Sequence, residues 1–403
     1  MNEWKSTPWG KIPASWGITT IDEASELVTD YTSNGSFKSL ADNVKYYDKP
    51  EYAWMVRYTD FSKGFVGPFI FIDKNAYDFL SKTKLYGNEI LISNVGIIGG
   101  VFRCPRLYSK MSLAPNSILV KFKESDDFYY YWLKSIYGQF MMDSLTIGSV
   151  QKKLSKTNFR KMLVPVPPIS TQNKIAEILQ SIDDKISVNS AINQNLQEQA
   201  KALYSDMIVD KADGTWIPGT LSDVAIVTMG QSPKGDTYNE DGTGTVFFQG
   251  RAEFGFRFPT RRLYTTEPKR MAQSNDALMS VRAPVGDMNV AYEDCCIGRG
   301  LSAIRSKDGH QSYVLYTMFD LREQLDVFNG EGTVFGSINR DALNNMPISI
   351  PPKNVLDQFE ALVSPMDAAI RNNFEEICRL ESLRDSLLPR LMSGELDVSE
   401  IDL

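Results

Sequence analysis

An arginine-rich run at residues 245–262, TVFFQGRAEFGFRFPTRR, contains side chains well suited to hydrogen bonding with nucleic-acid bases. If the run is a β-strand, its two-residue period places Gln249, Arg251 and Glu253 on one face. More arginines follow within a few residues: Arg257, Arg261 and Arg262. Glutamine pairs well with adenine in the DNA major groove, and arginine pairs with guanine and with phosphates. The run therefore indicates base contact, although taken alone it fits a half-exposed strand with ordinary ion pairs slightly better.

Other basic and polar residues are candidates for the same chemistry. The segment EYAWMVRYTDF alternates like a strand, which would place Arg57 and Thr59 on one face. A glycine-containing turn, IGSVQKKLSK, has a basic tip formed by Lys152 and Lys153. Arg340 lies in the segment GSINRDALNN, which matches that turn later in the chain. We predict Arg57, Thr59, Lys152, Lys153 and Arg340 as further candidate contacts to nucleic acid.

No arrangement of residues predicts catalysis. The sequence GQSPKG at residues 230–235 is followed by Asp236, so the lysine and hydroxyl of a phosphate-binding loop are missing. No GxGxxG opens a helix, and neither Pro-Pro pair follows the Asp or Asn of an amino-methyltransferase motif. The only histidine is His310, and the four cysteines form no CxxC pair. We expect a binding protein with no metal and no cofactor of its own.

Charge distribution is more informative than net charge, which is −7. Residues 1–167 have a net charge of +5, whereas residues 208–352 have −4. The second segment nevertheless contains ten arginines and only four lysines. An acidic chain can therefore still present basic surfaces to phosphates. The N-terminus lacks a signal-peptide pattern and no apolar run is long enough to span a bilayer, so we expect a cytoplasmic protein.

Two long segments must position these side chains. Residues 171–207 and 355–391 each repeat apolar residues every 3.5 positions, which is typical of a coiled-coil helix. Each helix would be about 55 Å long, and we expect the two to pair antiparallel. Asn189 and Asn373 lie near the helix midpoints, where they would specify register. The alternative is an ordinary helical hairpin with these asparagines in solvent. Pro389 should kink or end the second helix, and Gly394 should mark its stop.

The whole chain reads as a tandem repeat with an offset of 184 residues. GSVQKKLSKTNFRKMLVPVPP is matched by GTVFGSINRDALNNMPISIPP, and the helices match with no gap. The predicted segments are a first globule at 1–168, a helix at 169–209, a second globule at 210–352, and a helix with an acidic tail at 353–403. The predicted fold class is α+β, with two mixed α/β globules joined by an antiparallel coiled coil and related by a pseudo-two-fold internal repeat.

These ordered elements resemble the specificity subunit of type I restriction–modification systems, and the resemblance covers nearly the whole chain. It rests on GNEILISNVGIIGG, the two Pro-Pro segments and the doubled helix. The resemblance implies two target-recognition domains, each reading half of a split site in double-stranded DNA across an unread spacer. It also implies two methyltransferase subunits docked on the helices, which two restriction/motor subunits can join. S-adenosylmethionine, ATP and Mg would then be held by those partners.

Two other function classes stay open from the sequence alone. One is a non-DNA scaffold, in which a coiled coil holds two protein- or ligand-binding globules apart. The other is a fused enzyme, which the absence of catalytic motifs disfavours. Salt-dependent binding to duplex DNA would separate the first alternative from a DNA reader, because phosphate contacts release counterions.

Overall fold

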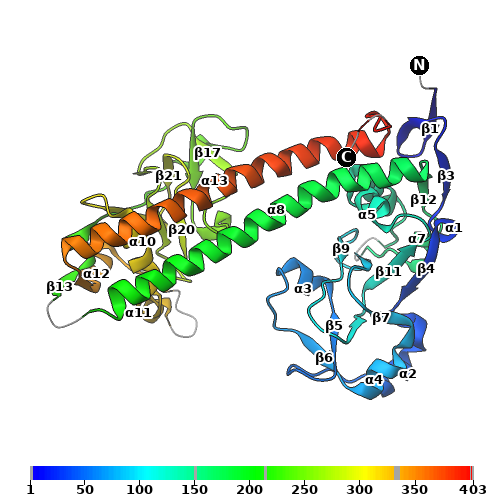
Figure 1. Ribbon diagram of the computed structural model, residues 1–403, viewed down its shortest axis with the longest axis horizontal. Helices are drawn as coiled ribbons and strands as arrows, with labels where there is room; N and C mark the ends of the chain where they lie inside the picture. The colour runs from blue at the N-terminus through cyan, green and yellow to red at the C-terminus, as the bar shows by residue number, and fades with distance from the viewer. Residues whose placement is uncertain (1–2, 149–151, 213–215, 331–335, 400, 402–403) are drawn as a thin grey trace. The chain divides into compact units, whose positions relative to one another are not determined.

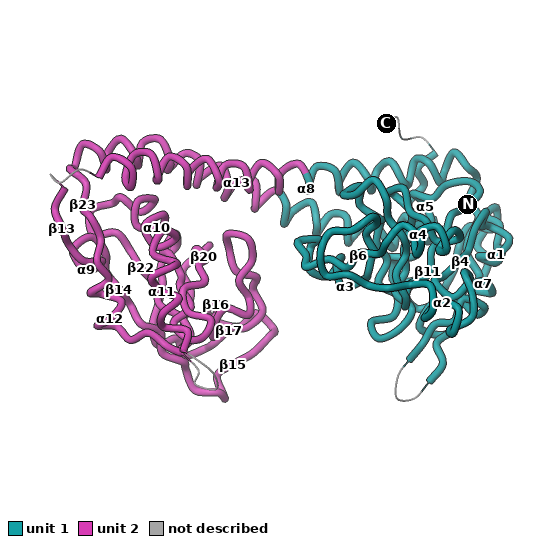
Figure 2. The backbone as a smooth tube through the Cα atoms, turned by 90° about the horizontal axis from the view of Figure 1, so that it is seen from below, with its two compact units in different colours: residues 1–187, 377–403 teal, residues 188–376 magenta. Residues whose placement is uncertain are grey.

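The computed structural model describes residues 3–148, 152–212, 216–330, 336–399 and 401. The chain forms two compact units, unit 1 (residues 1–187 and 377–403) and unit 2 (residues 188–376), shown in different colours in Figure 2. Each unit combines one globule with the helix segments that pack on it. The sequence-based boundaries separate globules from helices instead. Within the described ranges, no helix combines the length and the apolar character needed to cross a membrane.

The two long helices are α8 (Ile169–Tyr204) and α13 (Lys353–Met392). A π-helical turn, Ser205–Val209, extends the first of them. We expected Pro389 to kink or end the second helix. The helix does not end there, because α13 continues for three residues beyond Pro389. Leu391 and Met392 are fully buried in the core of unit 1, and this packing offsets the hydrogen bond that proline cannot donate. Gly394 follows with φ +73°, as expected for a helix stop.

Within unit 2, α8 and α13 run antiparallel (Figure 1). The Asn189 side-chain amide donates to Glu376 Oε2 at 2.8 Å. Four residues later on α8, Asn193 Oδ1 accepts from the Asn373 amide at 2.9 Å. Asn189 and Asn193 are buried, so they do not point to solvent as in a simple hairpin. Both predicted asparagines therefore make polar contacts across the helix pair, although each bonds a different residue rather than the other.

Unit 1 contains the opposite ends of the same helices, again antiparallel. Arg384 Nη1 of α13 donates to Asp183 Oδ1 of α8 at 2.9 Å. Nearer the start of α8, Lys174 Nζ donates to the carbonyl of Ser399 at 2.8 Å. The predicted antiparallel pairing of the helices is confirmed within each unit.

The globule of unit 1 contains two four-stranded sheets. An antiparallel sheet has the strand order β4-β11-β8-β9. Its strands are β4 (Ser25–Asp30), β8 (Ile90–Ser93), β9 (Val101–Arg103) and β11 (Ser117–Phe122). A mixed sheet has the order β6-β5-β10-β7, in which β10 runs parallel to β5. Its strands are β5 (Ala53–Val56), β6 (Ile70–Ile72), β7 (Lys84–Leu85) and β10 (Met111–Leu113).

Short elements connect and cover these sheets. Two strand pairs are formed by β1 (Trp4–Thr7) with β2 (Gly10–Pro13), and by β3 (Gly17–Thr20) with β12 (Leu163–Val166). The helices are α1 (Ile21–Ala24), α2 (Phe37–Asn43), α3 (Tyr58–Ser62), α4 (Lys74–Phe79), α5 (Asp126–Lys134), α6 (Ile136–Ser144) and α7 (Lys156–Arg160). The aromatic face of α5 packs with the start of α8 and the end of α13 in one apolar cluster.

The globule of unit 2 repeats both sheets. Its antiparallel sheet has the order β14-β22-β19-β20, and its mixed sheet β15-β17-β16-β21-β18 with β21 parallel to β16. The strands of these sheets are β14 (Ala225–Met229), β15 (Tyr238–Asn239), β16 (Thr245–Phe248), β17 (Leu263–Thr265), β18 (Met271–Ala272), β19 (Ala277–Ser280), β20 (Met288–Val290), β21 (Cys295–Ile297) and β22 (Leu301–Ser306). A separate antiparallel pair is formed by β13 (Ile217–Thr220) with β23 (Pro347–Ile350). The helices are α9 (Leu221–Val224), α10 (Gln311–Asp320), α11 (Arg322–Asp326) and α12 (Arg340–Asn344).

The two globules therefore share one topology. Strand pairing places β4, β11, β8 and β9 in the same order as β14, β22, β19 and β20. The mixed sheets also correspond, with one parallel pair at the same place in each and the additional strand β15 in unit 2. The predicted α+β internal repeat is confirmed, and it extends to the globule interiors, where the sequences have diverged.

Candidate nucleic-acid interface

Arg57 and Thr59 do not lie on a strand face as predicted, because β5 ends at Val56 and helix α3 begins at Tyr58. Asp60 ends the strand: its buried carboxylate accepts from the Arg57 backbone N–H at 2.9 Å and caps the new helix. The Arg57 guanidinium bonds the same carboxylate at 2.5 Å and the Pro68 carbonyl at 2.8 Å. Arg57 is therefore held in a fixed position with 32% of its side chain exposed, and Thr59 is exposed beside it.

Both residues line a groove on the globule of unit 1. It consists of two adjoining cavities of about 510 and 540 Å³, which share Tyr46, Val95, Pro115 and Asn116 in their walls. We call it the unit 1 groove. The first cavity is further lined by Arg57, Tyr58, Thr59 and Ile97, and the second by Phe37, Lys153, Lys156 and Thr157. Aromatic rings for stacking thus lie beside amide, hydroxyl and ammonium groups, a combination that suits bases and phosphates.

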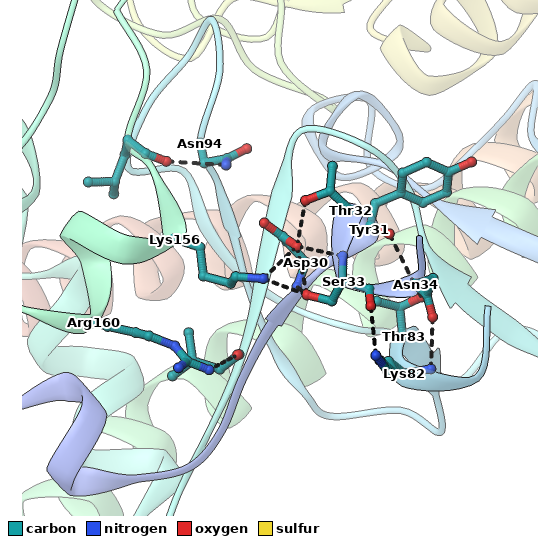
Figure 3. A network of polar contacts seen from close by, with 12 residues as sticks. Asp30, Tyr31, Thr32, Ser33, Asn34, Lys82, Thr83, Asn94, Lys156 and Arg160 are labelled. Carbon is teal, nitrogen blue, oxygen red and sulfur yellow. Dashed lines mark hydrogen bonds and ion pairs between the residues drawn. The ribbon is translucent and has the colours of Figure 1, made fainter. Parts of the chain in front are cut away.

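A polar network supports one wall of the unit 1 groove (Figure 3). Lys156 Nζ donates to Asp30 Oδ1 at 2.9 Å and to the Ser33 hydroxyl at 2.5 Å. Burial alone would raise the pKa of Asp30, but hydrogen bonds from Lys156, Ser33 and Thr32 outweigh it and lower that pKa. The carboxylate therefore stays charged and holds Lys156 in place, so part of that lysine's charge is already neutralised.

Of the lysine pair at 152–153, Lys153 lines the second cavity of this groove, whereas Lys152 does not. Lys152 Nζ bonds Asp143 Oδ1 at 2.8 Å and remains 59% exposed. Lys153 is exposed, and its backbone pairs with Ile147 in both directions at 2.9 and 3.0 Å. The rest of the predicted basic turn, residues 149–151, lies outside the described residues. Both lysine side chains are therefore exposed at the surface of unit 1.

In unit 2, the predicted strand face with Gln249, Arg251 and Glu253 does not exist. Strand β16 ends at Phe248, and residues 251–253 form a single 3₁₀ turn that buries Glu253. Gly300 approaches this backbone so closely that an added Cβ would lie 2.8 Å from the Gln249 carbonyl, so the chain turns away from the sheet here. Gln249 and Arg251 still project outward, bonded to Ser232 at 3.0 Å and Asp287 at 2.7 Å.

Arg261 and Arg262 lie on the surface, with about half of each side chain exposed. Arg261 pairs with Glu293 at 2.5 Å. Arg262 pairs with Glu253 at 2.5 Å and Glu240 at 3.4 Å. The exposed pairs with Glu293 and Glu240 contribute about 0–1 kcal/mol, so a phosphate can replace either carboxylate at little cost. Glu253 is buried, so its bond to Arg262 is more costly to give up. Arg261 and Arg262 both remain candidate DNA contacts.

Arg257 does not lie on the surface, contrary to its prediction as a DNA contact. Its side chain is only 4% exposed and points toward the helices rather than outward. The guanidinium donates to Asp367 Oδ1 of α13 and to the Tyr316 hydroxyl of α10, both at 3.0 Å. A charge that is buried and paired cannot reach a base without breaking the globule–helix packing. We therefore withdraw Arg257 from the candidate DNA contacts.

The remaining predicted residue, Arg340, is exposed at the first position of α12. Asn339 caps that helix by accepting from the Ala342 N–H at 2.8 Å, which fixes the direction of the first turn. Residues 331–335, just before it, lie outside the described residues. Sequence reasoning missed Tyr46, Asn116 and Lys156 of the unit 1 groove. The Pro115-Asn116 turn could have revealed one of them, since Asn116 has φ +66°.

Three of the four cysteines, Cys104, Cys295 and Cys296, and the single histidine, His310, are buried. Burial raises the pKa of the Cys104 and Cys295 thiols, which makes them poor nucleophiles. His310 is buried between two carboxylates, with Nε2 2.9 Å from Asp357 Oδ1 and Nδ1 2.9 Å from Asp308 Oδ2. The described residues contain no group of three or more His, Cys, Asp or Glu side chains arranged to hold a metal ion.

The fold and these surfaces define a protein with two recognition units built on one repeated design. The chain belongs to the family of type I restriction modification DNA specificity domains, whose model matches it twice, at residues 15–198 and 214–371. Its function is that of a specificity subunit of a type I restriction–modification system. Neither the family model nor the relatives described below support a non-DNA scaffold.

Two relatives agree with this membership, and a solved structure shares the fold. Two proteins of Methanocaldococcus jannaschii are named as specificity subunits of the type I restriction enzymes MjaX and MjaIX. The first is 25% identical, over 98% of this chain and 96% of the relative. The second is 23% identical, over 99% and 98%. The crystal structure of a type I restriction–modification system S subunit from M. genitalium has the same fold, with TM-score 0.57, 14% identity, and coverage of 93% and 96% of the two chains.

Proposed function

We propose that each unit reads one half of a bipartite site in double-stranded DNA, and that the base pairs between the halves are not read. The observation that carries this proposal is the twofold match to a DNA specificity domain on two globules of one topology. The shared topology supports a shared way of docking on DNA. The differing exposed residues support two different half-site sequences.

The candidate contacts follow from position and exposure. In unit 1 they are Arg57, Thr59, Lys152 and Lys153, together with Tyr46 and Asn116 of the unit 1 groove. In unit 2 they are Gln249, Arg251, Arg261, Arg262 and Arg340. Phosphate contacts by the lysines and arginines would supply most of the affinity, and a few base-edge contacts would supply specificity.

Catalysis in this proposal belongs to partner subunits in the cytoplasm. The chain itself would be non-catalytic and would dock two methyltransferase subunits, which two restriction/motor subunits join in a complete system. S-adenosylmethionine would be held by the methyltransferase subunits, and ATP and Mg by the restriction/motor subunits. The resemblance to type I specificity subunits supports this division of labour.

The test uses the chain co-purified with its methyltransferase partner. Methylated adenines in host DNA define the site, and duplexes are then made with either half-site scrambled. We expect methylation to require both halves, and log K of DNA binding to fall with log salt at a slope of about −5 for about six phosphate contacts. Methylation that ignores one half-site, or binding that is insensitive to salt, would contradict the proposal.

A further inference from the structure

The same hydrogen bond joins globule and helix in both units. In unit 1 the Tyr131 hydroxyl of α5 donates to Asp183 Oδ2 of α8 at 2.9 Å. In unit 2 the Tyr316 hydroxyl of α10 donates to Asp367 Oδ1 of α13 at 3.0 Å. The two aspartates are 184 residues apart, which is the offset of the repeat, and the tyrosines lie on corresponding helices.

Each aspartate also bonds an arginine, but the two arginines come from different places. Arg384 of α13 donates to Asp183 at 2.9 Å. Arg257, from the loop before β17, donates to Asp367 at 3.0 Å. The residue that precedes Arg384 by the repeat offset is Ala200, so the second unit has no arginine at that position of its helix pair. Corresponding aspartates in the two units therefore pair with arginines from different parts of the chain.

These clusters are polar points in a largely apolar contact, and they are polar contacts that both units share. In unit 2, α13 also bonds the start of α10 through Asp357, which lies 2.9 Å from His310 Nε2, and through Glu360, which accepts from the N–H groups of Ser312 and Tyr313. The surrounding residues of α5 with α8, and of α10 with α13, pack through aliphatic and aromatic side chains. Apolar contacts are not directional, so by themselves they allow a globule to turn or slide on its helix. A charge-assisted hydrogen bond between two fixed side chains does not allow this, because it weakens steeply with distance and angle.

Both tyrosine hydroxyls are suited to donate a hydrogen bond to their aspartate. Tyr131 is 4% exposed and Tyr316 is 1% exposed. Burial, with the nearby aspartate, raises the pKa of the Tyr131 hydroxyl, and burial raises that of Tyr316. Both hydroxyls therefore keep their proton at neutral pH and can act as hydrogen-bond donors.

We propose that these Tyr–Asp–Arg clusters, which we call the head latches, fix the angle of each globule on its helix and thereby restrict the spacing between half-sites that the complex accepts. The proposal rests on the proposed function, because spacing has meaning only for a two-part DNA site. Changing the spacer by one base pair shifts a half-site by about 3.4 Å and rotates it by about 35°. A globule held by its latch cannot follow that movement, whereas a globule that has lost the latch bond can follow part of it. Tyr131, Asp183, Tyr316 and Asp367 are therefore positioning residues.

The experiment compares methylation rates of the complex with its methyltransferase on three duplexes. One has the native spacer, and the others are one base pair shorter or longer. For Tyr131→Phe and Tyr316→Phe we expect the ratio of native-spacer to altered-spacer rates to fall by about tenfold, which corresponds to one charge-assisted hydrogen bond. Base preference within each half-site should not change, since no latch residue lies on the candidate DNA surface.

Matched controls lie on the same helices. Tyr130→Phe removes a hydroxyl that bonds only Lys134 in the described structure, and Tyr313→Phe removes one bonded to the Ser349 carbonyl. Neither contacts an aspartate of a latch, so we expect wild-type spacer discrimination from both. If a Tyr→Phe variant assembles poorly, Asp183→Asn keeps the side-chain shape, weakens both latch bonds and makes the same prediction.

The outcomes separate the two levels of inference. Unchanged spacer discrimination in Tyr131→Phe, Tyr316→Phe and Asp183→Asn would overturn the latch proposal while leaving the bipartite reader intact. The latch proposal would also be overturned if Tyr130→Phe lost as much spacer discrimination as Tyr131→Phe. If the wild-type complex itself shows no dependence on spacer length or half-site, the proposed function fails and not the latch alone.

Discussion

Breaking the buried ion pair between Arg257 and Asp367 should destabilise unit 2 far more than breaking any exposed pair in that unit. Arg257 is 4% exposed and the Asp367 side chain 22% exposed. In Asp367→Leu the guanidinium keeps the Tyr316 hydroxyl but loses its counter-charge. Removing one partner of a buried pair costs about 3–5 kcal/mol, and the partial exposure of Asp367 favours the lower end of that range. We therefore expect a loss of about 3 kcal/mol in the free energy of unfolding.

The thermal consequence can be measured directly. A unit of this size shifts its melting temperature by about 2–4 °C per kcal/mol, so Asp367→Leu should melt about 6–12 °C lower than the wild type. Calorimetry or circular dichroism of the complex would record this transition. The control is Glu293→Gln, which leaves the exposed Arg261 without its partner and should cost no more than about 1 kcal/mol.

A double variant tests the reason behind the loss. Arg257→Met with Asp367→Leu removes both charges and replaces them with apolar side chains of similar length. Because the desolvation cost of both charges disappears together with the attraction, the double variant should recover part of the lost stability. The part not recovered is the cost of the buried Tyr316 hydroxyl, which loses Asp367 as its acceptor. If Asp367→Leu costs less than about 1 kcal/mol, or if the double variant is no more stable than the single one, Arg257 is not the buried, dependent charge described above.

Further predictions concern DNA reading, spacing and pH. Arg251→Ala should lower discrimination at the second half-site by about tenfold, within the roughly 1–3 kcal/mol of one base contact, and methylation of half-site variants would show equal losses at both halves if the effect were a folding defect. Inserting one heptad into each long helix should lengthen the unread spacer by about three base pairs, because seven residues add about 10 Å, and methylation footprinting would reveal an unchanged spacer if the helices do not set it. Burial by itself would lower the pKa of His310, but hydrogen bonds with Asp357 and Asp308 raise it above its usual value. The stability that this proton contributes is therefore complete below about pH 6 and is lost as pH rises through the raised pKa, so urea unfolding between about pH 6 and 8 should show a smaller pH slope in His310→Gln than in the wild type.

The sequence alone was sufficient for the frame of this protein. A 3.5-residue period and a repeat offset are local or register properties, so they predicted α8, α13 and their antiparallel pairing without knowledge of any long-range contact. The doubled motifs indicated the family for the same reason. The ends of strands could not be predicted in the same way. Asp60 and Gly300 interrupt the strands through contacts that the alternation of apolar and polar residues does not encode.

Only the tertiary structure decided where the functional side chains lie. Arg257 looked like its exposed neighbours Arg261 and Arg262, and its burial depends on Asp367, which lies 110 residues away in the chain. The unit 1 groove likewise joins residues from distant segments. The divergent globules proved to share one topology because strand order is set by backbone pairing, which many different side-chain sequences can satisfy. Period and composition report what a segment does locally, whereas burial, ion pairing and groove shape arise from which segments meet.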